Sequence, residues 1–207
     1  MFTNKDVEIL KKETLYKGFF TIYGYQVRHK LFAGGVSPVL QREIFDRGHA
    51  VALLPYDPKL DKVVLLEQFR LGAVPTSQNP WLIELVAGMI EVGESVEDVA
   101  IREAQEEAGI TVTQLEKIYS FLPSPGGCTE RIDLFVGLVD STQTGELCGL
   151  ENEGEDIRVI VVSREEALEM LNSGKIDNAS AIIGLQWLSL NYKALRCSGD
   201  LCQTNEK

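Results

Sequence analysis

The stretch REAQEEAGI, residues 102–110, concentrates acidic charge on a short predicted helix over residues 96–108. Glu103, Glu106 and Glu107 fall within one and a half helical turns. Like charges four residues apart destabilise a helix by about 0.2–0.5 kcal/mol per pair. A chain that keeps these glutamates together must therefore give them either solvent or a partner of opposite charge.

The helical period indicates which side of this helix the glutamates occupy. At about 100° per residue, Glu103 and Glu107 lie on the same side as apolar residues such as Val99, and Glu106 lies at the edge of that side. The opposite side, which should face solvent, takes a different set of residues: Glu97, Asp98, Arg102 and Gln105. Buried carboxylates are costly unless they are paired or bound to a cation. A merely solvated acidic face is therefore disfavoured, and a cation between the glutamates is predicted.

The chemistry of these ligands indicates the kind of cation. Carboxylate oxygens without cysteine or histidine favour a hard ion, Mg²⁺ or its substitute Mn²⁺. Proteins use Mg²⁺ held by a few carboxylates on phosphate substrates, where the ion bridges oxygens and activates water.

The chain as a whole is acidic, with 31 Asp and Glu against 20 Lys and Arg and a formal net charge of −11. Such a surface repels nucleic acid and anionic membranes, and no Lys/Arg cluster offsets it. We therefore expect no nucleic-acid and no membrane partner. An anionic substrate would need well-placed arginines or metal ions to bind.

Other features of the sequence suggest a reduced, cytoplasmic chain. The 207 residues hold no apolar run of about 18 residues, and the charged N-terminal stretch lacks the apolar core of a secretory signal. The four cysteines have no zinc-ligand spacing, and only two histidines accompany them.

Strand and helix patterns divide the chain into three parts. Residues 1–46, rich in aromatic and β-branched residues, predict a small β extension. Residues 47–196 mix strand-like runs with three helical segments and predict a mixed sheet covered by helices, an α/β (α+β) domain. Residues 197–207 are polar and predict a loose tail.

Capping signals and apolar runs locate the elements of the main domain. Ser95 with Asp98, and Ser163 with Glu166, have the spacing of helix caps. The expected elements are a strand pair from His49 to Arg70, strands over 114–122, 133–139 and 157–163, and helices over 96–108, 164–171 and 181–195.

The acidic helix belongs to a longer pattern, G-x5-E-x7-R-E-x-x-E-E-x-G-I. Its specified positions are Gly88, Glu94, Arg102, Glu103, Glu106, Glu107, Gly109 and Ile110. This pattern resembles the Nudix box, with one minor departure at Ala104, where a larger aliphatic residue is usual. Almost the whole chain resembles the bacterial ADP-ribose pyrophosphatase branch of that family, including a proline, Pro125, sixteen residues beyond Gly109.

The resemblance implies a Nudix fold and a set of roles around a metal ion. It implies metal ligation by Glu103, Glu107 and Glu155, by the backbone carbonyl of Ala87, and by Glu106 as a nearby or alternative ligand. It implies that Glu153 is the general base. From its residues alone, the acidic stretch around Glu153 and Glu155 favours a flexible acidic loop, and only the resemblance reverses this interpretation. The glycine-bearing residues 140–156 would suit a mobile lid.

Other box residues would support this site. Glu94 and Arg102 would brace the motif through charge-assisted hydrogen bonds, although an exposed surface pair is the alternative. Gly88 and Gly109 would permit the turns at its two ends.

The resemblance also implies a substrate site shared between two subunits, with the N-terminal extension crossing to a partner in a homodimer. Its substrate-binding positions would be Phe19, Phe20, Arg42, Glu43, Arg47, Arg70, Met89, Ser124, Pro125, Gly126 and Glu130. The two phenylalanines would lie near adenine. The alternative is that they simply pack in the hydrophobic core.

The implied activity is magnesium-dependent hydrolysis of ADP-ribose to AMP and ribose 5-phosphate. A related nucleotide sugar such as ADP-glucose is an alternative substrate. A non-catalytic Nudix domain that senses ADP-ribose is a further alternative, disfavoured by the complete box.

Overall fold

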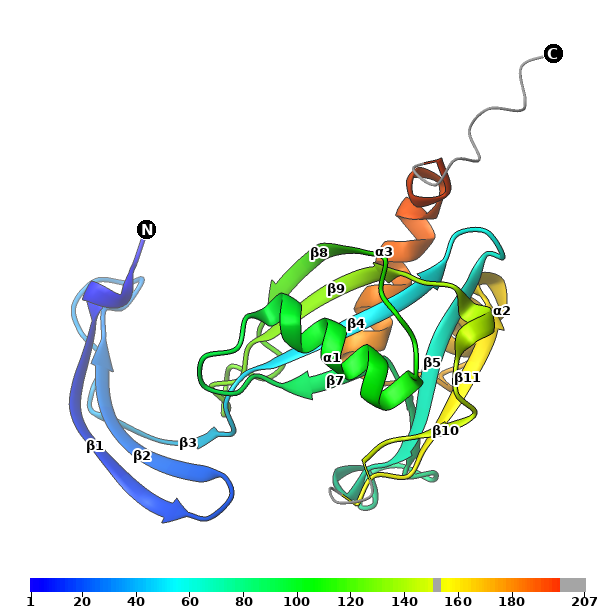
Figure 1. Ribbon diagram of the computed structural model, residues 1–207. Helices are drawn as coiled ribbons and strands as arrows, with labels where there is room; N and C mark the ends of the chain where they lie inside the picture. The colour runs from blue at the N-terminus through cyan, green and yellow to red at the C-terminus, as the bar shows by residue number, and fades with distance from the viewer. Residues whose placement is uncertain (151–153, 198–207) are drawn as a thin grey trace. The chain divides into compact units, whose positions relative to one another are not determined.

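The computed structural model of the protein describes residues 1–150 and 154–197. The chain forms two compact units (Figure 1). The first unit holds residues 1–49 together with 122–131, and the second holds residues 50–121 and those from 132 onward. The predicted tail falls almost entirely outside the described residues.

The first unit is built on a three-stranded antiparallel sheet, in the order β1–β2–β3. Every residue of β1 is exposed, so this sheet has little core of its own in the single chain. The predicted antiparallel extension is confirmed. Its elements are the 3₁₀ turn η1 (Asn4–Asp6) and the strands β1 (Val7–Lys17), β2 (Thr21–His29) and β3 (Leu40–Asp46).

Residues 122–131 join the first unit because they run beside the end of β3. Phe45 and Cys128 form a parallel bridge, and the Phe45 N–H donates to the carbonyl of Gly127 (2.8 Å). The Thr129 hydroxyl donates to Asp46 Oδ1 (2.8 Å). These contacts join two stretches that lie about eighty residues apart in the sequence.

The second unit contains a mixed sheet in the order β10–β11–β5–β4–β9–β8, with β6 paired to β5 and β7 paired to β4. Strands β4 and β9 are parallel, and the other pairs are antiparallel. The strands are β4 (Ala50–Asp57), β5 (Lys62–Phe69), β6 (Trp81–Glu84), β7 (Val86–Met89), β8 (Gln114–Phe121), β9 (Ile132–Leu138), β10 (Leu147–Cys148) and β11 (Ile157–Ser163).

The sheet opens between β4 and β5. These strands form a hairpin but pair only next to its turn, at Tyr56 with Val63 and at Asp57 with Lys62. Further along, β6 pairs with β5 and β7 pairs with β4, so the two short strands fill the space between them. Val86 of β7 then packs in the apolar cluster under α1, whereas Leu85 packs in the cluster on the other face.

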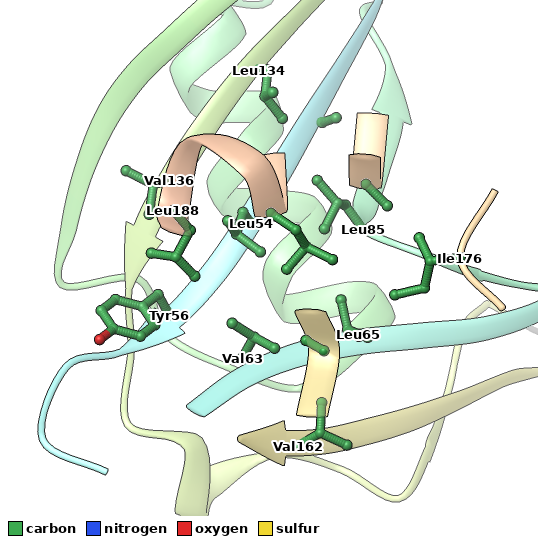
Figure 2. Packing of buried hydrophobic residues seen from close by; sticks show 14 of the residues in the cluster. Leu54, Tyr56, Val63, Leu65, Leu85, Leu134, Val136, Val162, Ile176 and Leu188 are labelled. Carbon is green, nitrogen blue, oxygen red and sulfur yellow. The ribbon is translucent and has the colours of Figure 1, made fainter. Parts of the chain in front are cut away.

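Helices cover both faces of this sheet, as predicted. Helix α1 (Val96–Ala108) packs on one face and contributes to one apolar cluster, whereas α2 (Arg164–Asn172) and α3 (Ala179–Arg196) contribute to the cluster on the other face. Figure 2 shows the second cluster, in which Leu188 of α3 lies over Leu54 and Tyr56 of β4. Short 3₁₀ turns lie at η2 (Leu71–Ala73) and η3 (Ser141–Gln143).

Side-chain caps fix where the helices begin. Ser95 accepts a hydrogen bond from the backbone of Asp98, and Ser163 accepts one from that of Glu166. Both starts are those that the sequence predicts, and the helix over 96–108 has the predicted bounds. Within the described part of the chain, no helix is both long enough and apolar enough to cross a membrane.

Candidate active site

The buried side of α1 carries two carboxylates. Glu107 is 2% exposed, and its Oε2 accepts a hydrogen bond from the backbone N–H of Ala87 (2.8 Å). Glu103 lies one turn earlier on the same side and is half-buried. The helical period therefore predicts the burial of these glutamates correctly, and β7 supplies the first of the contacts that hold them.

Burial makes ionisation of both carboxylates unfavourable in the chain without a cation. The pKa of Glu107 is raised to about 8, mainly by desolvation. The charges of Glu103 and Glu155 contribute to this shift, and the Ala87 hydrogen bond opposes it. Desolvation also raises the pKa of Glu103 to about 7; the Arg102 charge opposes this shift, and the charges of Glu106 and Glu155 add to it. A bound cation would lower both pKa values again, because its positive charge stabilises the ionised form of each carboxylate.

Gly88 makes room for Glu103. A Cβ atom on residue 88 would overlap the carboxylate of Glu103 and also its Cγ atom. Gly88 lies inside β7 and has no positive φ, so the turn expected for it is wrong. The glycine is needed because a helix side chain passes over the strand, which periodicity along one element does not reveal. Gly109 does terminate α1, with φ of 66° in the left-handed region that favours glycine.

Arg102 lies across three glutamates of the motif. Its Nη1 donates to Glu103 Oε1 and to Glu106 Oε2, each at 2.9 Å. Its Nε and Nη2 contact the two oxygens of Glu94 at 3.3 and 3.4 Å. The helical period places Arg102 on the solvent side, but its long side chain turns back over the glutamates and is only half-exposed. The pair with Glu94 is therefore part of a network rather than an isolated surface pair.

Glu155 and Arg70 lie near the α1 carboxylates. The Leu150 N–H donates to Glu155 Oε2 (3.1 Å), and the charge of Glu155 raises the pKa of Glu107. Arg70 follows the end of β5, and its charge lowers the pKa of Glu107. Arg70 Nε donates to Glu84 Oε2 (2.7 Å), a contact that the sequence patterns do not predict. The position of Glu84, an acidic residue at the end of the apolar strand β6, could have indicated this ion pair.

The donor set suits a hard divalent cation, because it consists of carboxylates and a nearby backbone carbonyl. Over residues 1–150 and 154–197, no three Asp, Glu, His or Cys side chains already form a group that could hold a metal ion. Arg102 instead engages Glu103 and Glu106. Glu153 lies outside the described residues. Within the predicted lid, residues 141–143 form η3 and β10 pairs with β11.

The first unit brings several predicted substrate residues together. Phe19 is 87% exposed and packs edge-on against Phe20 (ring centroids 4.8 Å apart), which contacts Phe45 in the same way (5.1 Å). The guanidinium of Arg47 lies 5.6 Å from the Phe20 ring, and its Nε is 3.4 Å from Glu130 Oε1. Phe19 is therefore not a core residue in the single chain.

Arg47 Nε is also buried without a hydrogen-bond partner among the residues that are described. Other predicted positions of this unit lie on its surface: Arg42, Glu43, Ser124, Pro125 and Gly126. Met89, in the second unit, is exposed at the end of β7.

Comparison with known proteins identifies the family. The NUDIX domain matches residues 46–182. The chain belongs to the Nudix family. Among curated relatives, the ADP-ribose pyrophosphatase of Escherichia coli (strain K12) is 56% identical over 195 residues, covering 94% of this chain and 93% of the relative. The ADP-ribose pyrophosphatase of Haemophilus influenzae is 54% identical over 200 residues, covering 95% of this chain and 92% of that one.

More distant relatives include the GDP-mannose pyrophosphatase of Enterobacter sp. (strain 638), which is 33% identical over 197 residues, covering 89% of this chain and 96% of the relative. A solved structure described as an ADP compounds hydrolase superposes with a TM-score of 0.67 at 20% identity, covering 90% of this chain and 96% of that one, and so shares the fold. The predicted Nudix fold and the predicted resemblance to the bacterial ADP-ribose pyrophosphatase branch are both confirmed.

Proposed function

We propose that this chain is a Nudix hydrolase that cleaves the pyrophosphate bond of ADP-ribose and releases AMP and ribose 5-phosphate. The observation that carries this proposal is the pair of carboxylates on α1, with Glu107 buried, Glu103 half-buried and Glu155 near them. They lie in a chain 54–56% identical to ADP-ribose pyrophosphatases over nearly its whole length. An intact acidic cluster whose ionisation is costly without a cation fits a catalyst better than a domain that only binds ADP-ribose.

The enzyme requires a divalent metal, and we infer that Mg²⁺ serves, with Mn²⁺ as a substitute. Glu103, Glu107 and Glu155 would hold it together with the Ala87 carbonyl, and Glu106 is an alternative ligand. When bound, the ion neutralises pyrophosphate charge and lowers the pKa of a coordinated water. Arg102 would have to share Glu103 with the ion, since Nη1 now donates to Oε1 of that residue.

The protein's own residues bind and orient the substrate. Arg70, held by Glu84, would contact a phosphate. Phe19 would stack on adenine. Arg47, which is paired with Glu130 but makes no hydrogen bond through Nε, would donate from Nε to an acceptor of the ligand. Ser124, Pro125, Gly126 and Glu130 would line the ribose side, with Arg42, Glu43, Phe20 and Met89 completing the contacts. Glu153 would take the proton from the attacking water.

A homodimer would complete the site. The exposed sheet of the first unit supports this proposal, because its apolar side chains lack cover in the single chain. They include Val7, Ile9, Leu10, Leu15 and Tyr16 on β1. A partner subunit would bury such a face and gain hydrophobic stabilisation. The cytoplasmic location expected from the sequence stays a prediction.

The deciding experiment measures AMP release from a panel of substrates at a fixed Mg²⁺ concentration. We expect ADP-ribose to give the highest kcat/KM, and ADP-glucose to be slower. GDP-mannose belongs in the panel because GDP-mannose pyrophosphatases are also relatives, and it should release GMP slowly if at all. Higher kcat/KM on another nucleotide sugar would reassign the substrate, whereas binding of ADP-ribose without turnover of any substrate would indicate a sensor.

A further inference from the structure

Gln68, near the end of β5, carries a buried donor with no acceptor. The residue is 6% exposed, and its side-chain nitrogen Nε2 is buried. In the parts of the chain that the structure describes, Nε2 has no hydrogen-bond partner. Buried polar groups in proteins almost always have a partner, so an orphaned amide needs a reason.

The strand register places this amide on the face of the sheet that α1 covers. Gln68 pairs directly with Ile157 on β11, and directly paired residues point to the same face. Ile157 and Leu66, two residues before Gln68 on β5, both belong to the apolar cluster under α1. Gln68 therefore replaces an apolar side chain at the edge of that cluster.

The residues around this position are those of the candidate active site. Arg70 has an extended backbone, so it continues the alternation of β5 and lies on the same face as Gln68. Leu66 pairs with Glu84, the partner of Arg70, and Glu155 lies two residues before Ile157. The unpartnered amide thus lies at the base of the site, beside Arg70.

The nearby carboxylates already have other donors. Glu107 accepts from the Ala87 backbone, Glu103 from Arg102, and Glu155 from the Leu150 backbone. Nε2 makes no hydrogen bond to any of them, so its acceptor is absent from the described residues. A phosphate oxygen is a suitable acceptor, because the Gln68 amide and the Arg70 guanidinium could then donate to the same anion. Of these two donors only Arg70 carries a charge.

We propose that Gln68 is a substrate-binding residue that donates from Nε2 to a phosphate oxygen of the bound pyrophosphate, next to Arg70. This role rests on the proposed function, since it requires a diphosphate substrate. The free chain leaves the donor unsatisfied, and the substrate supplies the acceptor. The hydrogen bond to substrate therefore offsets the free-energy cost of burying the Gln68 donor without a partner.

Gln68→Met tests this role because it keeps the length of the side chain and removes the donor. We expect kcat/KM for ADP-ribose to fall by about 10- to 100-fold, mostly through a higher KM, as for the loss of a hydrogen bond to a charged group. The melting temperature in EDTA should stay the same or rise, because an unsatisfied buried donor is gone. Gln105→Met is the matched control, since Gln105 is exposed on the far side of α1, and it should leave kcat/KM unchanged.

Three results would overturn the proposal: unchanged kcat/KM in Gln68→Met, a loss reversed entirely by more Mg²⁺, or a loss explained by a lower melting temperature. If Gln68→Met does not fold, Gln68→Glu takes its place, because it has the same shape but carries a negative charge in place of the donor. It should lose at least as much kcat/KM as predicted for the methionine variant, and unchanged kcat/KM would overturn the proposal. Failure of the wild-type chain to cleave any nucleotide sugar would instead overturn the proposed function itself.

Discussion

The carboxylate of Glu103 fills the space that a Cβ atom on residue 88 would occupy. Because the overlap reaches Cγ as well as the carboxylate, the whole side chain must move if residue 88 gains a methyl group. The position of Glu103 on α1 therefore depends on the absence of a side chain at Gly88 on β7.

Gly88→Ala should therefore displace Glu103 and weaken metal binding. We expect the Mg²⁺ concentration for half-maximal rate to rise by about 10- to 100-fold, which is typical when a metal ligand loses its orientation. Titration of the ADP-ribose hydrolysis rate with Mg²⁺ measures this shift. Gly72→Ala is the control, because a Cβ there meets no atom within 4 Å and its φ is not positive. A Gly88→Ala variant with unchanged Mg²⁺ dependence would show that Glu103 adapts without loss.

The stability of the metal-free chain should fall as pH rises. The pKa of Glu107 is raised from its usual 4.5 to about 8. The unfolded chain therefore loses this proton at lower pH than the folded chain, and stability declines between those two pH values. Glu103 adds to the decline up to about pH 7. Urea denaturation in EDTA at pH 5 and pH 8 measures the difference, and Mg²⁺ should reverse it.

Glu107→Gln should remove the contribution of Glu107 to this pH dependence and abolish turnover. At pH 8 without metal, the variant should be more stable than the wild type by at least about 1 kcal/mol, because the buried charge that destabilises the wild type at this pH is gone. At pH 4 and below, where Glu107 is protonated in both states, the two proteins should be equally stable. A variant that is largely unfolded without metal at pH 8 would point to a structural role for this carboxylate.

Disruption of the exposed β1 face should dissociate the proposed homodimer. Ile9→Glu adds a charge to an exposed apolar position of the first unit, and Leu190→Glu makes the same change on α3 as a control. The first variant should sediment as a monomer and its KM for ADP-ribose should rise by about tenfold or more, since stacking on a base contributes about 1–3 kcal/mol. A monomer with unchanged KM would remove the shared-site proposal, and a variant that remains a dimer would place the interface elsewhere.

Periodicity and capping signals predict the elements of the second unit well, because they act within one helix or strand. Helix α1 begins at the residue that Ser95 predicts, and Glu107 is buried as its angle requires. Contacts between elements distant in sequence were not predictable in this way. The opening between β4 and β5, the overlap of Glu103 with residue 88, and the pairing of Phe45 with Cys128 all depend on tertiary packing. Gln68 is a similar case: one glutamine in an apolar strand does not reveal from the sequence that its amide lacks a hydrogen-bond partner.

The last prediction separates the proposed base from a proposed metal ligand. Glu153 and Glu155 are two residues apart, and on an extended path both could reach the substrate, so their spacing does not assign their roles. Glu155 has a described position, with its carboxylate held by the Leu150 N–H and its charge acting on Glu107. Glu155→Gln should therefore raise the Mg²⁺ concentration for half-maximal rate.

Glu153→Gln should act differently if Glu153 is the base. The maximal rate should fall by about 10²–10⁴-fold, because general base catalysis is lost, while the Mg²⁺ concentration for half-maximal rate stays nearly the same. The pH profile of the residual rate should lose its acidic limb, since no carboxylate must then be deprotonated before water attacks. The two variants serve as controls for each other, because each removes one negative charge from the same stretch. Near-normal turnover of Glu153→Gln at saturating Mg²⁺ would instead direct the search for the base to Glu106 and Glu151.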